Sequence, residues 1–589
     1  MKSLWNTLRE LVNVMPKGAK SFYLTYAILT SLLAFLDTAA LGLIVLVVPA
    51  VVQGKAIELP LIGEIPNSGM VWIAVVVCGL FILKGVFGVT LHWIATRRFA
   101  RYELEIGSSL FRKYMRSSWE QRTQLSTAEV TRLVDTAMAN ANMGFVLQLA
   151  MIPGNAFTFV AVLTVLVMAQ PLTALVALVY LGLISFTMMF VVTKKAKVAG
   201  THNRQYGYRV ATIMTEMVDA LKEVTLRDKL DEVGRVVEQN RVMATRGRAN
   251  ISFLGAVPKY AFEAALIGGF LLVGGVGYLN GGGAEAAAAV TLFAATGFRM
   301  IPAMNGVQGS LTMASANEIS ARDVVTAMTA PDTPEIETQD SAVLGENPRE
   351  LVLDDVSFRY ASSDRDVLSG LSMRIPMGSS LAIVGPSGAG KSTLIDILLG
   401  LSKPTAGRME VDGVALNTVM QQWRKNVGYV PQRVALFDGT VAQNVALTWE
   451  EAYEPDRVID ALRRAHLSEL ATRGEGIYER VGERGQSISG GQQQRLGIAR
   501  ALYTDPLIMV MDEATSSLDT ETENRVTESM RELQGDVTFI TVAHRLATIR
   551  DYDQVCYLED GKIMGSGTFD EVVQQVPAFK VQAKLAGLV

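Results

Sequence analysis

The residues with the most specific chemistry form a glycine-rich stretch at 385–392, with the sequence GPSGAGKS. A β-rich run at 381–384 precedes it and a helix-like run at 392–399 follows it, so a strand and a helix should flank it. Glycines let backbone N–H groups converge on phosphate oxygens, and the helix N-terminus adds positive potential. In such a loop the lysine reaches the β and γ phosphates and the final hydroxyl ligates Mg²⁺. The stretch predicts a site for a nucleoside triphosphate and Mg²⁺, formed by Gly385, Ser387, Gly388, Gly390, Lys391, Ser392 and Thr393.

A pair of carboxylates follows a second apolar strand, at 507–511. At the end of such a strand Asp512 can hold the Mg²⁺ shell, and Glu513 beside it can orient and activate an attacking water. An acidic pair after a strand says little by itself. Together with the phosphate loop it predicts hydrolysis of the nucleotide.

The region from about 350 to 575 resembles the nucleotide-binding domain of ABC transporters. The resemblance is carried by SGGQ at 489–492 and QQRL at 493–496, which are similar to the ABC signature. Ile488 stands where the family usually has leucine, a change that conserves volume. The resemblance implies that ATP is contacted by Ser489, Gly490, Gly491 and Gln492.

The other elements of this family occur in the expected order. By resemblance, Tyr360 stacks on adenine, Gln432 is the Q-loop glutamine and His544 is the switch histidine. ERG at 483–485 is similar to the exporter X-loop, and SSLD at 516–519 to the D-loop. A lone tyrosine or histidine would be interpreted as core packing, but the ordered set favours function. The implied catalytic residues are Glu513, His544 and Gln432, and the implied Mg²⁺ ligands are Ser392, Gln432 and Asp512.

In this family two such domains sandwich two ATP molecules, each held by the phosphate loop of one domain and the signature of the other. This chain has one copy of each motif and no internal repeat, so the resemblance implies a half-transporter that pairs with a second chain. Because Glu513, Gln432 and His544 are all retained, a two-fold homodimer is favoured over a heterodimer.

The part of the chain before about residue 310 predicts a membrane domain. Apolar residues make up 49% of the whole chain and charged residues 19%, and the apolar excess lies in this part. Basic residues crowd the connections at 97–132 and 194–227, which places both termini in the cytoplasm. The six segments that reach the length of about 20 residues needed to span a bilayer are 22–50, 70–95, 146–169, 171–193, 252–279 and 285–308.

The expected fold is an all-α transmembrane domain of six helices with long cytoplasmic helical extensions, followed by an α/β P-loop ATPase domain. Its limits are predicted at 1–329 for the membrane domain, 330–349 for a proline-punctuated acidic linker, and 350–589 for the ATPase domain. This order resembles the type IV exporter fold. In that fold 126–135 would lead into the first coupling helix, and the second would lie near 217–222.

An amphipathic segment at 4–12 has apolar residues at helical spacing. Two interpretations stay open, a helix lying in the headgroup plane of the membrane and a helix packed on protein. We expect an integral membrane protein, in the inner membrane of a bacterial cell, with the ATPase domain in the cytoplasm. The net charge of −4 gives no electrostatic reason to expect nucleic acid.

Four ionisable residues interrupt the predicted spans: Asp37, Lys84, Glu263 and Arg299. Such groups are costly in hydrocarbon and usually face a bundle interior or an aqueous cavity, which makes them candidates for contact with a substrate. Structural ion pairs, or side chains that extend to the membrane boundary, are the alternative.

The substrate is predicted from weaker similarities. Residues 423–432 and 436–440 look similar to segments of the flippases of lipid-linked oligosaccharides. Asp37 in the first span also resembles the acidic residue in the first helix of that family. The leading expectation is ATP-driven export or flipping of an amphipathic or lipid-linked substrate. The alternatives are a multidrug or peptide exporter, an importer with the exporter fold, and an ATP-gated channel or regulator.

Overall fold

The computed structural model describes residues 2–53, 57–59, 63–65, 70–330, 340–361, 363–482, 485–514, 520–543 and 545–589. Within these ranges the side chains of 37–74, Val77, 520–522, 524–525 and Ser529 are not described. The chain forms two compact units. The first unit comprises Met1–Met115 and Leu125–Asp332, and the second unit comprises Arg116–Gln124 and Thr333–Val589.

The first unit is helical apart from a short antiparallel pair of strands, β1 (Ile57–Leu59) and β2 (Gly63–Ile65). Five helices are long and apolar enough to cross a membrane in the described part of the chain. The helical elements are α1 (Lys2–Val14), α2 (Ala19–Gln53), α3 (Met70–Arg116), α5 (Thr127–Thr131), the π-helical turns η2 (Arg132–Ala137) and η3 (Asn140–Val146), α6 (Leu147–Ala169), α7 (Pro171–Asp219), α8 (Leu221–Leu226) and α9 (Leu230–Thr329).

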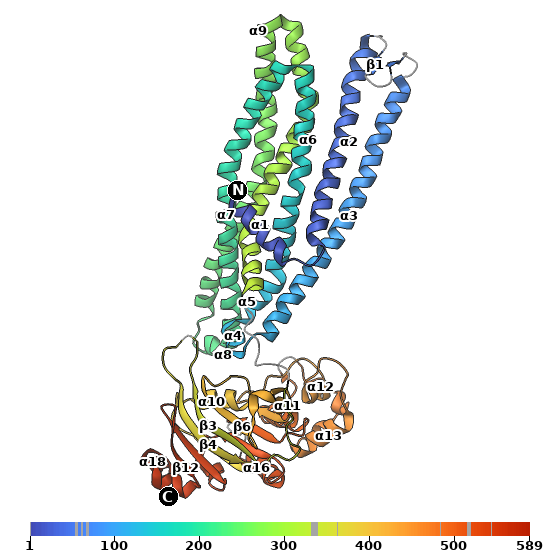
Figure 1. Ribbon diagram of the computed structural model, residues 1–589. Helices are drawn as coiled ribbons and strands as arrows, with labels where there is room; N and C mark the ends of the chain where they lie inside the picture. The colour runs from blue at the N-terminus through green and yellow to red at the C-terminus, as the bar shows by residue number, and fades with distance from the viewer. Residues whose placement is uncertain are drawn as a thin grey trace. The chain divides into compact units, whose positions relative to one another are not determined.

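The fifth and sixth predicted spans are both within α9. Its backbone leaves the helical conformation at Gly281 and Gly282, and Gly282 has φ = 74°, which favours glycine. Figure 1 shows the two halves of α9 running side by side from this turn. A Cβ on Gly277 would lie 3.0 Å from the Cα of Ala286, so small residues allow the two halves to approach closely. The six predicted spans are thus present in the first unit.

Helices α3 and α7 have 47 and 49 residues, about twice the length that a bilayer requires. These lengths account for the predicted helical extensions. Large apolar side chains along them are exposed, for example Ile82, Val89 and Phe186. Exposed apolar surface of this extent is typical of contact with lipid.

Two ion clusters join the helices of the first unit near one end. Glu318 of α9, 2% exposed, forms ion pairs with Lys197 of α7 and with Arg322, each at 2.7 Å. Ser3 and Thr7 of α1 donate hydrogen bonds to Glu318 as well. Helix α1 therefore packs on protein through its buried face.

The second cluster is centred on Asp323 of α9. Its carboxylate accepts from Arg132 of η2 at 2.9 Å and from both the Nε and Nη2 atoms of Arg204 of α7 at 2.8 Å. A bidentate arginine fixes the geometry of such a pair. Together the two clusters tie α1, η2 and α7 to the last turns of α9.

The second unit is an α/β structure with two sheets. The larger sheet has the order β12-β11-β5-β10-β9-β8, with parallel pairing between β11, β5, β10, β9 and β8 and an antiparallel β12 at its edge. The smaller sheet is antiparallel, with the order β4-β3-β6-β7. The strands are β3 (Glu350–Phe358), β4 (Leu368–Pro376), β5 (Ser380–Val384), β6 (Ala406–Val411), β7 (Val414–Ala415), β8 (Val427–Val430), β9 (Ile508–Asp512), β10 (Thr538–Val542), β11 (Gln554–Glu559) and β12 (Lys562–Gly567).

Helices cover the larger sheet, as parallel strands that are buried on both faces require. All five residues of β5 are buried. The helices of the second unit are α4 (Trp119–Gln124), α10 (Lys391–Leu398), α11 (Met420–Lys425), α12 (Val441–Ala446), α13 (Pro455–Arg464), α14 (Ser468–Thr472), α15 (Gly490–Leu502), α16 (Thr520–Leu533), α17 (Phe569–Gln575) and α18 (Pro577–Leu585), with 3₁₀ turns η4 (Leu416–Thr418), η5 (Gly476–Tyr478) and η7 (Leu546–Ile549).

Candidate nucleotide-binding site

The phosphate loop connects β5 to α10, as the sequence predicts. Gly388 and Gly390 have φ values of 83° and 99°, which glycine adopts without strain. These turns direct the chain from the end of a buried strand into a helix that begins at Lys391. The backbone N–H groups of this turn and the first turn of α10 are therefore arranged as an anion site.

Lys391 lies against the loop that it terminates. Its ammonium group donates to the carbonyl oxygens of Gly385 at 2.7 Å and Pro386 at 2.9 Å. Burial lowers the pKa of Lys391, while the carboxylates of Glu513 and Asp512 act to raise it. The cation is thus held at the phosphate loop and near both predicted acidic residues.

The two carboxylates that the sequence predicts to act in hydrolysis lie at the carboxyl end of β9. Asp512 is the last residue of that strand, and Glu513 follows in the left-handed conformation with φ = 52°. Non-glycine residues seldom adopt this conformation, and they do so mainly where the surrounding structure holds them. Here the backbone N–H of Glu513 donates to the carbonyl oxygen of Val542 at 3.2 Å.

Gln432 meets Glu513 across 81 residues of sequence. Its Nε2 atom donates to the Oε2 atom of Glu513 at 2.6 Å. The parallel pairing of β8 with β9 brings the ends of these strands together, which explains the contact. Gln432, Glu513 and Asp512 therefore lie in one place together with the ammonium group of Lys391.

Asp396 adds a carboxyl group that the sequence analysis did not single out. It lies on α10, and burial raises its pKa to about 6, against the effect of a hydrogen bond from Trp119 of α4. The charge of Asp512 raises the pKa further. Asp396 belongs to none of the motifs, so only the fold reveals that the charge of Asp512 acts on it.

The signature residues begin α15. Ser489 is the N-cap, and it forms a capping box in which the N–H of Gln492 donates to the Ser489 hydroxyl and the Ser489 N–H donates to Gln492 Oε1. Gln492 also donates to Glu469 at 3.0 Å. In the described part of the chain, the side-chain hydrogen bonds of Ser489 and Gln492 are thus made around α15 and not to the phosphate loop.

A family comparison and a structural comparison show what this chain is similar to. The model of the family described as ABC transporter matches residues 368–516. One solved structure, titled "Structure of a bacterial Atm1-family ABC exporter with ATP bound", superposes with a TM-score of 0.75 over 97% of this chain and 99% of that chain, at 23% identity. The chain therefore has the fold of that ABC exporter. At this identity the structural similarity establishes the fold alone.

Curated relatives match about two fifths of the chain. Over 243 residues, 40% of this chain, identity is 40% to a protein of Cupriavidus pinatubonensis named ATP-dependent lipid A-core flippase. A protein of the same name from Burkholderia pseudomallei is 43% identical over 224 residues, 37% of this chain. The matches span 41% and 37% of these relatives, so the chain covers about two fifths of their length.

Several predicted site residues of the ABC exporter fold lie outside the described residues. These are His544, the X-loop residues 483–484 and the D-loop residues 516–519. The side chain of Asp37 in α2 is outside the description as well. Their predicted roles stay predictions.

Of the four intramembrane candidates, Lys84 and Arg299 lie near a common neighbour. The guanidinium carbon of Arg299 on α9 is 5.3 Å from the ring centroid of Phe81 on α3, and Lys84 is one helical turn after Phe81. Glu263 is exposed on α9. Of the four candidates, Arg299 thus contacts the segment of α3 that also contains Lys84.

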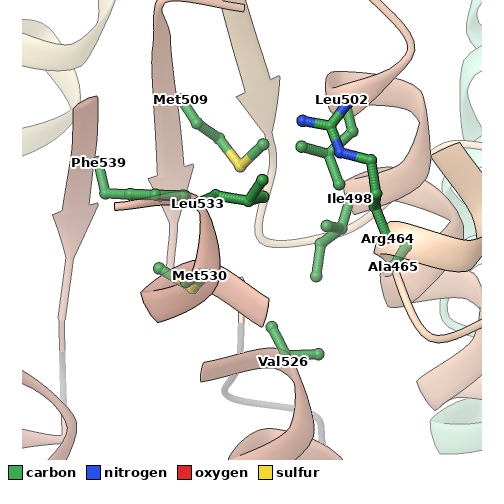
Figure 2. Close-up of a pocket in the computed structure, with 9 residues that line it drawn as sticks. All are labelled: Arg464, Ala465, Ile498, Leu502, Met509, Val526, Met530, Leu533 and Phe539. Carbon is green, nitrogen blue, oxygen red and sulfur yellow. The ribbon is translucent and has the colours of Figure 1, made fainter. Parts of the chain in front are cut away.

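A small apolar cavity in the second unit is separate from this site. Figure 2 shows its lining, which comes from α13, α15, α16, β9 and β10: Arg464, Ala465, Ile498, Leu502, Met509, Val526, Met530, Leu533 and Phe539. Its walls are apolar apart from Arg464, and none of the predicted site residues lines it. The cavity belongs to the core that packs α15 and α16 on the larger sheet.

Proposed function

We propose that this protein hydrolyses ATP to export or flip an amphipathic or lipid-linked substrate across a membrane. The observation that carries the ATPase part is the Gln432–Glu513 hydrogen bond beside Lys391. It gathers residues from three separate segments around the phosphate loop. A purely structural role for these three polar side chains would not explain why they meet beside the phosphate loop.

The residues divide the work of hydrolysis as follows. The phosphate loop and Lys391 bind the triphosphate, and Tyr360 supports the base. Glu513 accepts a proton from the attacking water, and Gln432 holds the Glu513 carboxylate through its amide N–H. We propose His544 as a further contact to the γ-phosphate.

The donors at the site fit Mg²⁺. Ser392 offers an exposed hydroxyl, Asp512 a carboxylate, and Gln432 a side-chain oxygen, since its amide nitrogen is used by Glu513. Mg²⁺ prefers oxygen ligands and is usually held by one or two carboxylates together with the phosphates of the substrate. When bound there, Mg²⁺ would neutralise charge that develops on the phosphates during hydrolysis.

We propose that two copies form each complete site. The signature residues and the phosphate loop belong to different parts of the second unit; Ser489 and Gln492 bond to each other, and Gln492 also donates to Glu469 of α14. A two-fold pair of chains would bring Ser489, Gly490, Gly491 and Gln492 of one copy to the nucleotide held by the other. ATP would then drive transport because it binds the closed pair better than the open one.

The substrate class rests on the first unit and on the relatives. The curated relatives carry the name lipid A-core flippase, and the described first unit has helices able to cross a membrane.

We propose domain limits of 1–329 and 350–589 with the linker 330–349. We also propose a bacterial inner membrane with the second unit in the cytoplasm, from the distribution of basic residues.

Reconstitution into lipid vesicles tests this function. The purified full chain is assayed for ATPase activity and for movement of fluorescent glycolipid, phospholipid, peptide and drug probes across the bilayer. We expect a lipid-linked or amphipathic probe to stimulate hydrolysis and to cross only with ATP and Mg²⁺. Movement of ions down their gradient on ATP binding alone would support a gated channel, and inward movement of a solute would support an importer.

A further inference from the structure

Thr393, in the first turn of α10, differs from its neighbour Ser392 in where it faces. Ser392 is exposed, whereas Thr393 is buried with 6% exposure. Adjacent residues of an α-helix point about 100° apart, so the two hydroxyls serve different surroundings. The hydroxyl of Ser392 is exposed and so available to the proposed Mg²⁺, whereas the side chain of Thr393 is buried in the protein.

The hydroxyl of Thr393 has a specific partner. It lies 3.1 Å from the hydroxyl of Tyr360, a hydrogen-bonding distance. Tyr360 is half-buried, so one part of its side chain contacts protein while another part is open. Without this bond a buried threonine hydroxyl would lose a hydrogen-bond partner, which is costly.

The ring of Tyr360 has a second support. It packs edge-on against Phe358, with 5.0 Å between ring centroids and an interplanar angle of 90°. Phe358 is 1% exposed and belongs to the core of the second unit. A ring that is held at its edge by Phe358 and at its hydroxyl by Thr393 cannot rotate freely.

These contacts join the two sheets of the second unit. Tyr360 follows β3 of the antiparallel sheet, and Thr393 belongs to the helix that follows β5 of the larger sheet. The bond therefore links the expected support of the nucleotide base with the loop that would bind its phosphates.

We propose that Thr393 is a positioning residue that holds Tyr360 as the platform for the nucleotide base, through the hydrogen bond between their hydroxyls. The role rests on the proposed function, because it concerns the same ATP site. It replaces the phosphate-binding role that the sequence suggests for Thr393: Thr393 should affect affinity through the base and not through the phosphates. It also predicts that removing either hydroxyl has the same consequence.

Nucleotide affinity of the full chain in detergent, with Mg²⁺, tests this role by calorimetric titration with ATP and with inorganic tripolyphosphate, which has no base. Thr393→Val and Tyr360→Phe each remove one hydroxyl and keep the shape. We expect each to weaken ATP binding by about 2- to 10-fold, the range for one neutral hydrogen bond. The double variant should be no weaker than either single one. Tripolyphosphate affinity should not change, and Thr393→Ser should restore ATP affinity.

Three results would overturn the inference: an equal loss of tripolyphosphate affinity in Thr393→Val, losses that add in the double variant, or wild-type ATP affinity in Tyr360→Phe. Tyr360→Phe leaves α10 untouched, so it decides the question even if Thr393→Val does not fold. Failure of the proposed function has a different result. In that case the wild-type chain does not bind ATP, or Lys391→Ala binds it as well as the wild type does.

Discussion

The two units of this protein show their function in different ways. In the second unit, Lys391, Gln432 and Glu513 come from segments far apart in sequence and meet at one place. In the first unit, the polar groups with described partners, such as Glu318 and Asp323, mainly join helices to each other. Phosphate chemistry requires particular residue types in a fixed geometry, whereas a membrane cavity can be lined in many ways. The difference teaches that a nucleotide site can be predicted from motifs, whereas a transported substrate cannot.

The largest expected effect concerns Glu513 in the second unit. Glu513→Gln removes the proposed base but keeps the shape, so we expect ATP turnover to fall by about 100-fold or more while ATP binding is retained. Steady-state hydrolysis and nucleotide titration measure the two quantities. Glu528→Gln, the same change at an exposed position of α16, is the matched control. Normal turnover in Glu513→Gln would show that another group is the base.

The next effect concerns the first unit, where the ion cluster is expected to be structural. Glu318→Gln leaves Lys197 and Arg322 close together without their shared carboxylate, which should destabilise the unit by about 2–3 kcal/mol. A lower thermal midpoint in detergent checks this. Glu105→Gln removes only an exposed pair with Arg101 and should cost less than about 1 kcal/mol. Equal midpoints for the two variants would contradict the structural role.

Helix packing in the first unit gives a smaller effect. Gly200 of α7 contacts Ala316 of α9 so closely that a Cβ would collide with the Ala316 carbonyl oxygen. Gly200→Ala should therefore destabilise the unit by about 1–3 kcal/mol. At Gly207, on the same helix, a Cβ would meet no atom within 4 Å, so Gly207→Ala should be neutral or stabilising. The thermal midpoint of Gly200→Ala should fall by several degrees relative to that of Gly207→Ala, which should stay the same or rise.

The smallest effect is a pH dependence in the second unit. Burial acts to raise the pKa of Asp553, but hydrogen bonds from Ser380 and Gln534 outweigh it and lower the pKa. The carboxyl of Asp553 therefore binds a proton more readily in the unfolded chain than in the folded one. The ionised Asp553 stabilises the folded state above the ordinary aspartate pKa near 4, and this stabilisation is lost as the pH falls through the lowered pKa.

Asp553→Asn tests this pH dependence. We expect the free energy of unfolding of the wild type to exceed that of this variant by about 1 kcal/mol at pH 7. The difference should become smaller as the pH falls below about 4. Thermal midpoints measured from pH 7 to pH 3 give the difference. Asp551→Asn, which removes an exposed pair with Arg531, should show no such trend. A constant difference for Asp553→Asn would argue against the lowered pKa.

Much of the fold could be predicted from the sequence, for physical reasons. The phosphate loop needs glycine at positive φ and a lysine at the start of a helix, and the structure has both at Gly388, Gly390 and Lys391. The membrane spans follow from their length and apolarity. The turn at Gly281 and Gly282 lies between the predicted spans 252–279 and 285–308, where glycine permits it.

Other features depend on contacts that no local pattern records. The bond between Tyr360 and Thr393 joins two sheets, and the environment of Asp396 depends on Trp119 of a distant segment. The partners of Glu318 lie up to 315 residues away. Local sequence determines which elements form, but these pairs arise only when the elements pack.

The central claim is that one chain holds half of each ATP site. It is tested most directly by counting the ATP retained per dimer in a Glu513→Gln background. Copies with Lys391→Ala and copies with Ser489→Arg are mixed, and mixed dimers are isolated by two affinity tags. If each site joins the phosphate loop of one copy to the signature of the other, a mixed dimer keeps one intact site and retains one ATP, while either variant alone retains none. Mixed dimers that retain no ATP would contradict the claim.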